Sequence, residues 1–256
     1  MIVYLRRRDF LKGFAGLFVS IFSSAFFFVE KARARKVNGN IQKGKRMKLP
    51  KPKINGEVSL ETAIKRRRTV RSFTSRPLSL EQCSQLFWAA QGITEDRGFK
   101  RAAPSGGALY PMDIYAVVGE NCVKGLKSGV YHYDPNGHAV SLVSEGDLRN
   151  KVASAALSQI WIATAPLNIL ITAEYYRITG KYGKRGFRYA IIEAGHIGQN
   201  ILLQSEAMGL GAGVVGAFKD KKIGQVINIP SSYEPLLILP VGYKTEGLQD
   251  GPTIRE

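Results

Sequence analysis

A cluster of cations stands at residues 67 to 71, where Arg67, Arg68 and Arg71 surround Thr69. Guanidinium groups bind a phosphate through paired hydrogen bonds, and a threonine hydroxyl can add another. The segment is therefore suited to hold a phosphate group. On charge alone, however, a solvated basic helix end is the better explanation of these residues.

Two glycine-rich segments would let the backbone approach a ligand closely. Ser105, Gly106 and Gly107 lie between two prolines, and the run GAGVVG at 211–216 ends in Val215 and Gly216. Where side chains are missing, backbone N–H groups can face a flat ring or an anion. A bare turn explains the first segment equally well, and a helix end followed by tight packing explains the second.

Lys181 and Tyr182 begin a basic stretch that continues through Lys184, Arg185 and Arg188. A lysine near other cations loses its proton more readily than an isolated one, so Lys181 is a candidate base. The Tyr182 hydroxyl could relay the proton or orient a substrate. Without further information, an exposed basic loop is the simpler interpretation.

Apolar periodicity and capping residues predict the elements that position these segments. We expect helices at 60–68, from Ser79 with Gln82 completing a capping box, from Ser144 and Asp147 toward Leu157, and at 187–210. We expect strands at 114–118, 130–133, 139–143, 167–172 and 236–241, and a long loop at 93–111. This mixed order predicts an α+β fold of a sheet with surrounding helices.

Three strings in this order resemble the nitroreductase family: RRTVRSF at 67–73, PSGGALYP at 104–111 and GAGVVGAF at 211–218. The resemblance extends over about residues 57 to 243. It implies a nitroreductase-like sheet with surrounding helices, assembled as an intertwined homodimer with two FMN molecules at the subunit interface.

The string KYGKRGFRY at 181–189, followed by EAGH at 193–196 and Asn200, is similar to the azoline-dehydrogenase (SagB/ThcOx-type) branch of that family. Ala108 points to the same branch, because general nitroreductases usually have Asn there. Members of the branch oxidise thiazoline and oxazoline rings in modified peptides to azoles.

The resemblance also implies roles for individual residues. Lys181 and Tyr182 match the catalytic pair, and Arg188, His196 and Asn200 are expected to support the dimer or the core. The implied FMN ligands are the phosphate partners Arg67, Arg68, Thr69 and Arg71, the ring contacts Ser105, Gly106, Gly107, Val215 and Gly216, and a C-terminal phosphate ligand, Arg255.

The function that follows is that of an FMN-dependent oxidoreductase, which transfers a hydride to the flavin from a small or peptidic substrate. The branch resemblance suggests oxidation of an azoline to an azole as the reaction. Two alternatives remain open, an exported nitroreductase-type flavin reductase and a non-enzymatic flavin-binding protein. A basic envelope-binding protein is a third class.

The N-terminal string RRDFLK at 7–12 resembles a twin-arginine export signal, and an apolar run follows from Gly13 to Val29. Ala32-Arg33-Ala34 offers a cleavage site, and an uncleaved membrane anchor is the alternative. We therefore expect a signal peptide at 1–34, recognition by the twin-arginine translocation machinery, and a periplasmic or other extracytoplasmic location.

The net charge of +17 is unevenly distributed along the chain. Residues 35 to 53 hold 8 Lys or Arg and no acidic residue, whereas residues 54 to 256 hold 23 against 18. We expect a basic, mobile linker at 35–56, which could lie on an anionic membrane surface, and an FMN-binding domain at 57–256. The weakly charged domain argues against nucleic acid as a partner.

Two cysteines are too few for a disulfide scaffold, and Cys83 shares a predicted helix face with Leu86 and Phe87. We therefore expect Cys83 to be a buried apolar residue. The three histidines are scattered and no Cys-x-x-Cys occurs, so a zinc site is not expected.

Overall fold

The computed structural model describes residues 46–95 and 98–245. The predicted export signal and Arg255 lie outside these residues. Within them, no helix combines the length and the apolar character that a membrane crossing requires.

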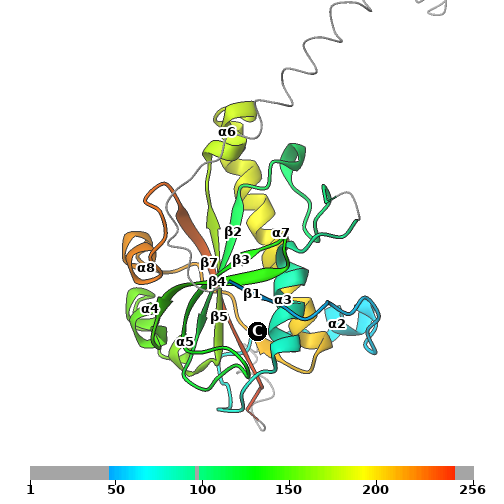
Figure 1. Cartoon of the computed structure of the whole chain (residues 1–256), viewed down its shortest axis with the longest axis vertical. Coiled ribbons are helices and arrows are strands. Elements are labelled where there is room, and N and C mark those ends of the chain that lie inside the picture. Colours follow the sequence, from blue (N-terminus) through cyan, green and yellow to red (C-terminus); the bar gives the residue numbers. More distant parts are fainter. Residues whose placement is uncertain (1–45, 96–97, 246–256) are drawn as a thin grey trace, which may run out of the picture. The chain divides into compact units, whose positions relative to one another are not determined.

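A seven-stranded antiparallel sheet forms the centre of the domain (Figure 1). Its central strands are buried along almost their whole length, and all seven residues of β5 are buried. In spatial order the strands are β1 (Arg46–Lys48), β4 (Ala139–Glu145), β3 (Gly129–Asp134), β2 (Met112–Val118), β5 (Leu167–Ala173), β7 (Glu234–Gly242) and β6 (Gly211–Ala212).

Helices cover both faces of the sheet, and alternate side chains of each strand enter two different cores. In β2, Ile114 and Ala116 join one core, which also holds residues of α3 (Leu80–Gln91) and α7 (Arg185–Ala207). Tyr115 and Val117 join the other core, with residues of α4 (Arg149–Ala155), α5 (Trp161–Thr164) and α8 (Asp220–Val226). The predicted α+β class is confirmed.

Local sequence signals explain where several helices begin. In α3 the Ser79 side chain accepts from the Gln82 N–H, and the Gln82 side-chain oxygen accepts from the Ser79 N–H, so the predicted capping box is present. In α2 (Leu60–Arg66) the side chain of Ser59 accepts from the Thr62 N–H. Two further short helices are η1 (Gly106–Ala108) and α6 (Tyr176–Tyr182).

One prediction about local structure is wrong, and one helix was not predicted. Ser144 does not begin a helix, because it lies in β4 opposite Val130, and the helix begins at Arg149. The Asp147 carboxylate instead binds the side chain of Arg149 and accepts from the Glu120 N–H. The sequence also did not lead us to expect α6, whose last two residues are Lys181 and Tyr182.

The predicted mobile linker at 35–56 also needs correction, because its C-terminal part is fixed to the domain. Residues 46–48 pair with β4, and the Leu49 side chain is buried. Ser84 donates from its hydroxyl to the carbonyl of Pro50 at 2.6 Å, and the Gln85 amide bonds both backbone groups of Lys53. The folded domain therefore includes residues from 46 onward rather than from 57.

Candidate functional site

The arginine segment, residues 67 to 71, runs beside the first glycine-rich residues of the 211–216 segment. The Val70 N–H donates to the Ala212 carbonyl at 3.0 Å, and Thr69 forms a parallel bridge with Ala212. A Cβ added at Gly211 would lie 2.8 Å from Val70 side-chain atoms, and one at Gly213 would lie 2.8 Å from the Trp161 ring. Glycine is therefore required for the two segments to pack this closely.

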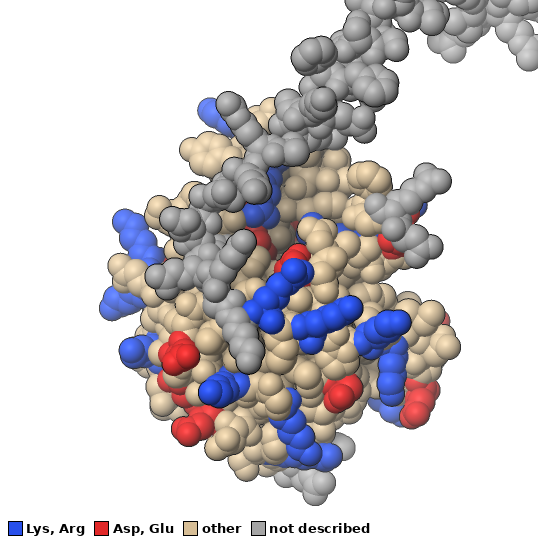
Figure 2. All heavy atoms as spheres, in the orientation of Figure 1, with Lys and Arg blue, Asp and Glu red and all other residues tan. Residues whose placement is uncertain are grey.

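The cations of the arginine segment differ in how free their side chains are. Arg68 donates to the carbonyls of Lys65 and Arg67, so its guanidinium caps the end of α2. Arg71 is exposed, and its guanidinium carbon lies 5.8 Å from the centre of the Trp161 ring. Figure 2 shows further Lys and Arg side chains over α2 on the face in view.

Val215 and Gly216 differ in the same way. Val215 is buried, and its N–H and carbonyl both pair with Ile238, at 2.8 and 2.9 Å. Gly216 is exposed, and a Cβ built there would meet no atom within 4 Å. The backbone of this segment is therefore accessible at Gly216, whereas Val215 is fixed to the sheet.

The loop from Ser105 to Tyr110 is held in an unusual backbone conformation. Gly107, Ala108 and Tyr110 all have positive φ, at 63°, 53° and 47°. The Ser105 hydroxyl oxygen accepts from the Tyr110 N–H at 2.9 Å, which closes the loop on itself. Non-glycine residues rarely adopt such angles, and strain of this kind concentrates at functional sites.

This loop lies directly against the predicted catalytic pair. A Cβ at Gly107 would lie 2.7 Å from the Tyr182 hydroxyl and 3.1 Å from the Lys181 ammonium nitrogen, and one at Gly106 would lie 3.3 Å from Ile178. The Lys181 ammonium also lies 5.3 Å from the centre of the Tyr182 ring. The structure therefore brings Lys181 and Tyr182 together with Gly106 and Gly107.

The same structure separates this group from the arginine segment. Gly106 packs on Tyr189, near the start of α7, whereas Val70 packs on Gly211, four residues beyond the end of α7 at Ala207. The helix between Tyr189 and Ala207 is about 27 Å long at 1.5 Å per residue. The predicted ligands therefore form two groups at opposite ends of α7, an arginine group and a lysine group with Ser105 to Gly107. Gly216 belongs to neither end, because Val215 before it pairs with Ile238 in the middle of β7.

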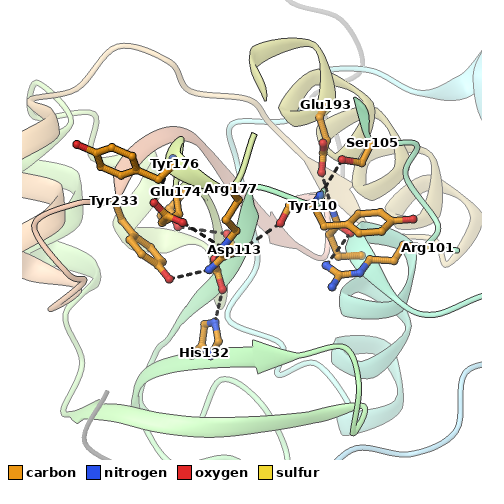
Figure 3. Close-up of polar contacts among 12 residues, drawn as sticks. Arg101, Ser105, Tyr110, Asp113, His132, Glu174, Tyr176, Arg177, Glu193 and Tyr233 are labelled. Atoms are coloured by element: carbon orange, nitrogen blue, oxygen red, sulfur yellow. Dashed lines mark hydrogen bonds and ion pairs between the residues drawn. The ribbon is translucent and has the colours of Figure 1, made fainter. Parts of the chain in front are cut away.

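A partly buried ion network holds α6 in place, and we did not predict it from the sequence. Arg177, one turn before Lys181, makes a 2.6 Å ion pair with Asp113 of β2 and a 3.3 Å ion pair with Glu174. It also donates to the Tyr233 hydroxyl at 2.7 Å and to the Tyr110 carbonyl at 3.3 Å (Figure 3). Arg177 thus joins α6, the sheet and the loop that carries Gly107.

Asp113 is the anionic centre of this network. Burial opposes its ionisation, but hydrogen bonds and the positive charge of Arg177 outweigh that cost and lower the pKa of the Asp113 carboxyl. His132 is bonded to the other carboxylate oxygen, at 2.8 Å. Such a network fixes its members rigidly, because each charge would be costly without its partners.

Glu193 is a second buried carboxyl, and it lies under the Ser105 loop on α7. Its Oε1 accepts from the Gln91 amide at 3.1 Å, and Gln91 in turn accepts from Arg101 at 3.4 Å. Burial raises the pKa of Glu193 to about 7, against the opposing effects of Ser105, Gln91 and Arg101. We noticed Glu193 only as part of the EAGH string and expected no role for it.

The expectations for the remaining residues have mixed outcomes. Asn200 donates to the carbonyls of Ala89 and Ala102, so its predicted core-support role is confirmed. Arg188 and His196 are exposed on α7, and their expected dimer role stays a prediction. Cys83 is buried as predicted, and burial raises the pKa of its thiol to about 12. The described part of the chain contains no group of side chains arranged to hold a metal ion.

Comparisons with known proteins bear on the family to which the chain belongs. A model of the nitroreductase family matches residues 64–243. A Methanocaldococcus jannaschii protein named as a nitroreductase, MJ1384, is 42% identical over 203 residues, which are 79% of this chain and 100% of that protein. The microcin B17-processing protein McbC of Escherichia coli is 26% identical over 165 residues, 63% of this chain and 61% of McbC.

Solved structures share the fold. A crystal structure named as a nitroreductase of Ralstonia eutropha JMP134 has a TM-score of 0.69 and 27% identity, and covers 81% of this chain and 92% of its own. The NADPH:FMN oxidoreductase of Vibrio harveyi, complexed with NAD+, has a TM-score of 0.55 and 19% identity, with 77% and 73% covered, and so shows the fold alone. The predicted nitroreductase-like sheet with surrounding helices is confirmed, and the chain belongs to the nitroreductase family.

Proposed function

We propose that the protein is an FMN-dependent oxidoreductase that works as a homodimer and removes a hydride and a proton from a small or peptidic substrate. The observation that carries this proposal is the convergence of Lys181 and Tyr182 on Gly107. A base, a hydroxyl and a side-chain-free backbone at one point are what proton removal beside a flat cofactor requires.

The residues present fit FMN in three respects. Arg67 and Arg71 remain for the phosphate once Arg68 is engaged with α2, and Thr69 lies between them. Gly216 presents exposed backbone four residues beyond Ala212, to which the arginine segment is bonded. At the other end of α7, the close packing around Gly106 and Gly107 leaves backbone in place of side chains. A protein of the same fold is named as an NADPH:FMN oxidoreductase.

A homodimer is proposed because the two ligand groups lie too far apart to hold one FMN within a single chain. The outer face of α7 carries exposed apolar side chains, with Phe187 46%, Ile191 59% and Ile192 49% exposed. Contiguous exposed apolar surface of this kind indicates a protein interface. A second copy packed on α7 in the reverse direction would place its lysine group beside the arginine group of the first.

In the proposed reaction, bound FMN supplies the hydride acceptor, and the chain supplies the rest. Lys181, as the neutral amine, takes the proton from the carbon next to the one that loses the hydride. The ring of Tyr182 packs edge-on against the ring of Tyr189, with 5.1 Å between the two ring centres. The Tyr182 hydroxyl holds the substrate or passes the proton to Lys181. The ion network of Arg177 keeps both residues at the end of a fixed helix.

The substrate class is proposed from the branch resemblance and from McbC, which is named as a microcin B17-processing protein. An azoline ring in a modified peptide fits the need for a hydride and an adjacent proton. If the chain is exported by the twin-arginine machinery, as we propose from RRDFLK, it acts outside the cytoplasm. The reduced enzyme would then pass its electrons to oxygen or a quinone-like acceptor. NADPH would not be the electron donor that reduces the flavin.

The test is a spectrum of the purified full-length protein followed by an anaerobic search for compounds that bleach it. We expect flavin absorption bands, and bleaching that slows by about 100-fold or more in K181A and in Y182F, as for loss of a general base. K124A, which changes an exposed cation in the turn between β2 and β3, should stay within about threefold of the wild type.

Three other outcomes would contradict parts of the proposal. A protein that takes up no FMN after reconstitution is no flavoenzyme. Equal bleaching rates in the wild type, K181A and Y182F would favour a binding role or a different base. Rapid bleaching by NADPH would favour the alternative of a nitroreductase-type flavin reductase.

A further inference from the structure

Glu193 lies beneath the loop that carries Ser105, and its hydrogen bonding is incomplete. Glu193 is buried, with 1% of its surface exposed. Oε1 accepts from Gln91, whereas Oε2 has no hydrogen bond of good geometry among the described residues. The Ser105 hydroxyl lowers the pKa of the Glu193 carboxyl, and Figure 3 shows the two side chains next to each other.

The charged groups that act on Glu193 come from two elements packed around it. Arg101 lies in the segment before η1, and Arg177 lies in α6. Both cations favour the carboxylate, while burial favours the neutral acid and raises the pKa of Glu193 to about 7. Both forms of the side chain are therefore populated near neutral pH.

Ser105 must respond to these two forms because a hydroxyl has one donor and two acceptor positions. One acceptor position is already used by the Tyr110 N–H, at 2.9 Å. An ionised Glu193 can only accept, so it draws the Ser105 O–H inward. A protonated Glu193 donates to the second acceptor position, which leaves the Ser105 O–H free to donate elsewhere.

We propose that Glu193 is a positioning residue that sets the direction of the Ser105 hydroxyl: a proton on Glu193 turns this O–H toward the cofactor, and its loss turns the O–H inward. The inference rests on the proposed function, in which Ser105 contacts FMN. Because Gly107 of the same loop adjoins Lys181 and Tyr182, the reversal takes place within the reaction site.

The experiment measures FMN affinity of the full chain from about pH 5.5 to about 8.5. One hydrogen bond is worth about fivefold in affinity, so the wild type should bind about fivefold more weakly than E193Q at the high end and equally at the low end. In E193Q the amide donates permanently to Ser105. The FMN phosphate itself ionises near pH 6, so the ratio between variants is the quantity that reports on Glu193.

Two variants serve as controls. E206Q changes another carboxylate of α7, which pairs with Lys244 at 2.6 Å, and should keep the wild-type pH dependence. S105A should bind FMN more weakly, and adding E193Q to it should change nothing at any pH. A constant ratio of E193Q to wild type, or a pH-dependent effect of E193Q that persists in S105A, would overturn the inference.

A second measurement separates this inference from the proposed function. In the protein without FMN, infrared spectroscopy should find a protonated carboxyl band that disappears near pH 7, is missing in E193Q and persists to higher pH in S105A, because the carboxylate then loses a donor. If no variant binds FMN, the proposed function fails and the band still decides whether Glu193 and Ser105 are coupled. A missing band, or one that S105A does not shift, would refute the coupling.

Discussion

At the scale of single residues, Gly107 combines a constrained backbone conformation with a close contact to the proposed catalytic pair. Its φ of 63° disfavours other residues, and a Cβ there would lie 2.7 Å from the Tyr182 hydroxyl. We expect G107A to lower the free energy of unfolding by about 1–3 kcal/mol and to displace Tyr182. Urea unfolding of G107A measures this change.

Gly180 provides the matched control, since it lies in α6 and a Cβ there would meet nothing within 4 Å. G180A should be neutral or stabilising by up to about 1 kcal/mol, because alanine favours a helix. Equal effects of G107A and G180A would show that the tight contact at Gly107 is unimportant.

Glu193 makes a separate prediction about stability, and its sign follows from the raised pKa. Between the ordinary value of 4.5 and about 7, the folded protein keeps a proton that the unfolded chain has lost. Stability therefore falls as pH rises through this range, by an amount on the order of 3 kcal/mol.

E193Q removes this penalty because its amide does not ionise. E193Q should match the wild type in thermal or urea unfolding near pH 5 and exceed it near pH 8 by up to about 3 kcal/mol. A stability difference between the two proteins that is the same at both pH values would show that Glu193 does not titrate in this range.

At the scale of elements, α6 depends on Arg177 for its position. Removing the guanidinium would leave Asp113 buried without its cation, which typically costs about 3–5 kcal/mol. We expect R177Q to lose that much stability in urea unfolding and also to slow substrate oxidation, because Lys181 is on the next turn of the helix.

The double variant D113N/R177Q tests whether the ion pair is the reason. It removes both charges, so much of the lost stability should return. If the double variant is as unstable as the sum of R177Q and D113N, Arg177 stabilises α6 through contacts other than Asp113.

Local signals made some of these elements predictable. The capping box of Ser79 and Gln82 and the apolar run of β5 depend on residues close in the chain, and both were predicted. The pairing of Arg177 with Asp113 joins residues 64 positions apart and leaves no periodic signal. The strand β1 is three residues long and has no apolar alternation, so charge alone suggested a mobile linker.

The candidate site also contains residues that sequence strings predicted and residues that they did not. The glycine and arginine strings, matched to a family, pointed to Gly107, Lys181 and the arginine segment. The same strings gave no role to Glu193, because only its burial beneath Ser105 makes that carboxyl unusual. Sequence patterns likewise gave no indication that α7 separates the two ligand groups.

At the scale of the whole molecule, the exposed apolar face of α7 predicts the oligomeric state. We expect I191E/I192E to be monomeric and to lose FMN, because two buried charges would oppose packing of a second copy. Analytical ultracentrifugation and the flavin absorbance measure both effects. I160E alters an apolar residue that is also exposed but lies in the turn before α5, and it should remain a dimer.

The central claim is that each FMN site takes one ligand group from each protomer, and a mixed dimer tests it most directly. R67A/R71A disables the arginine group, and G107V disables the lysine group, so neither protein alone should hold FMN. Co-expressed and purified as a heterodimer, the two chains should recover about half of the wild-type flavin, because one of the two shared sites is then intact. A heterodimer without any flavin would contradict the account, because sites built within single protomers would all remain defective.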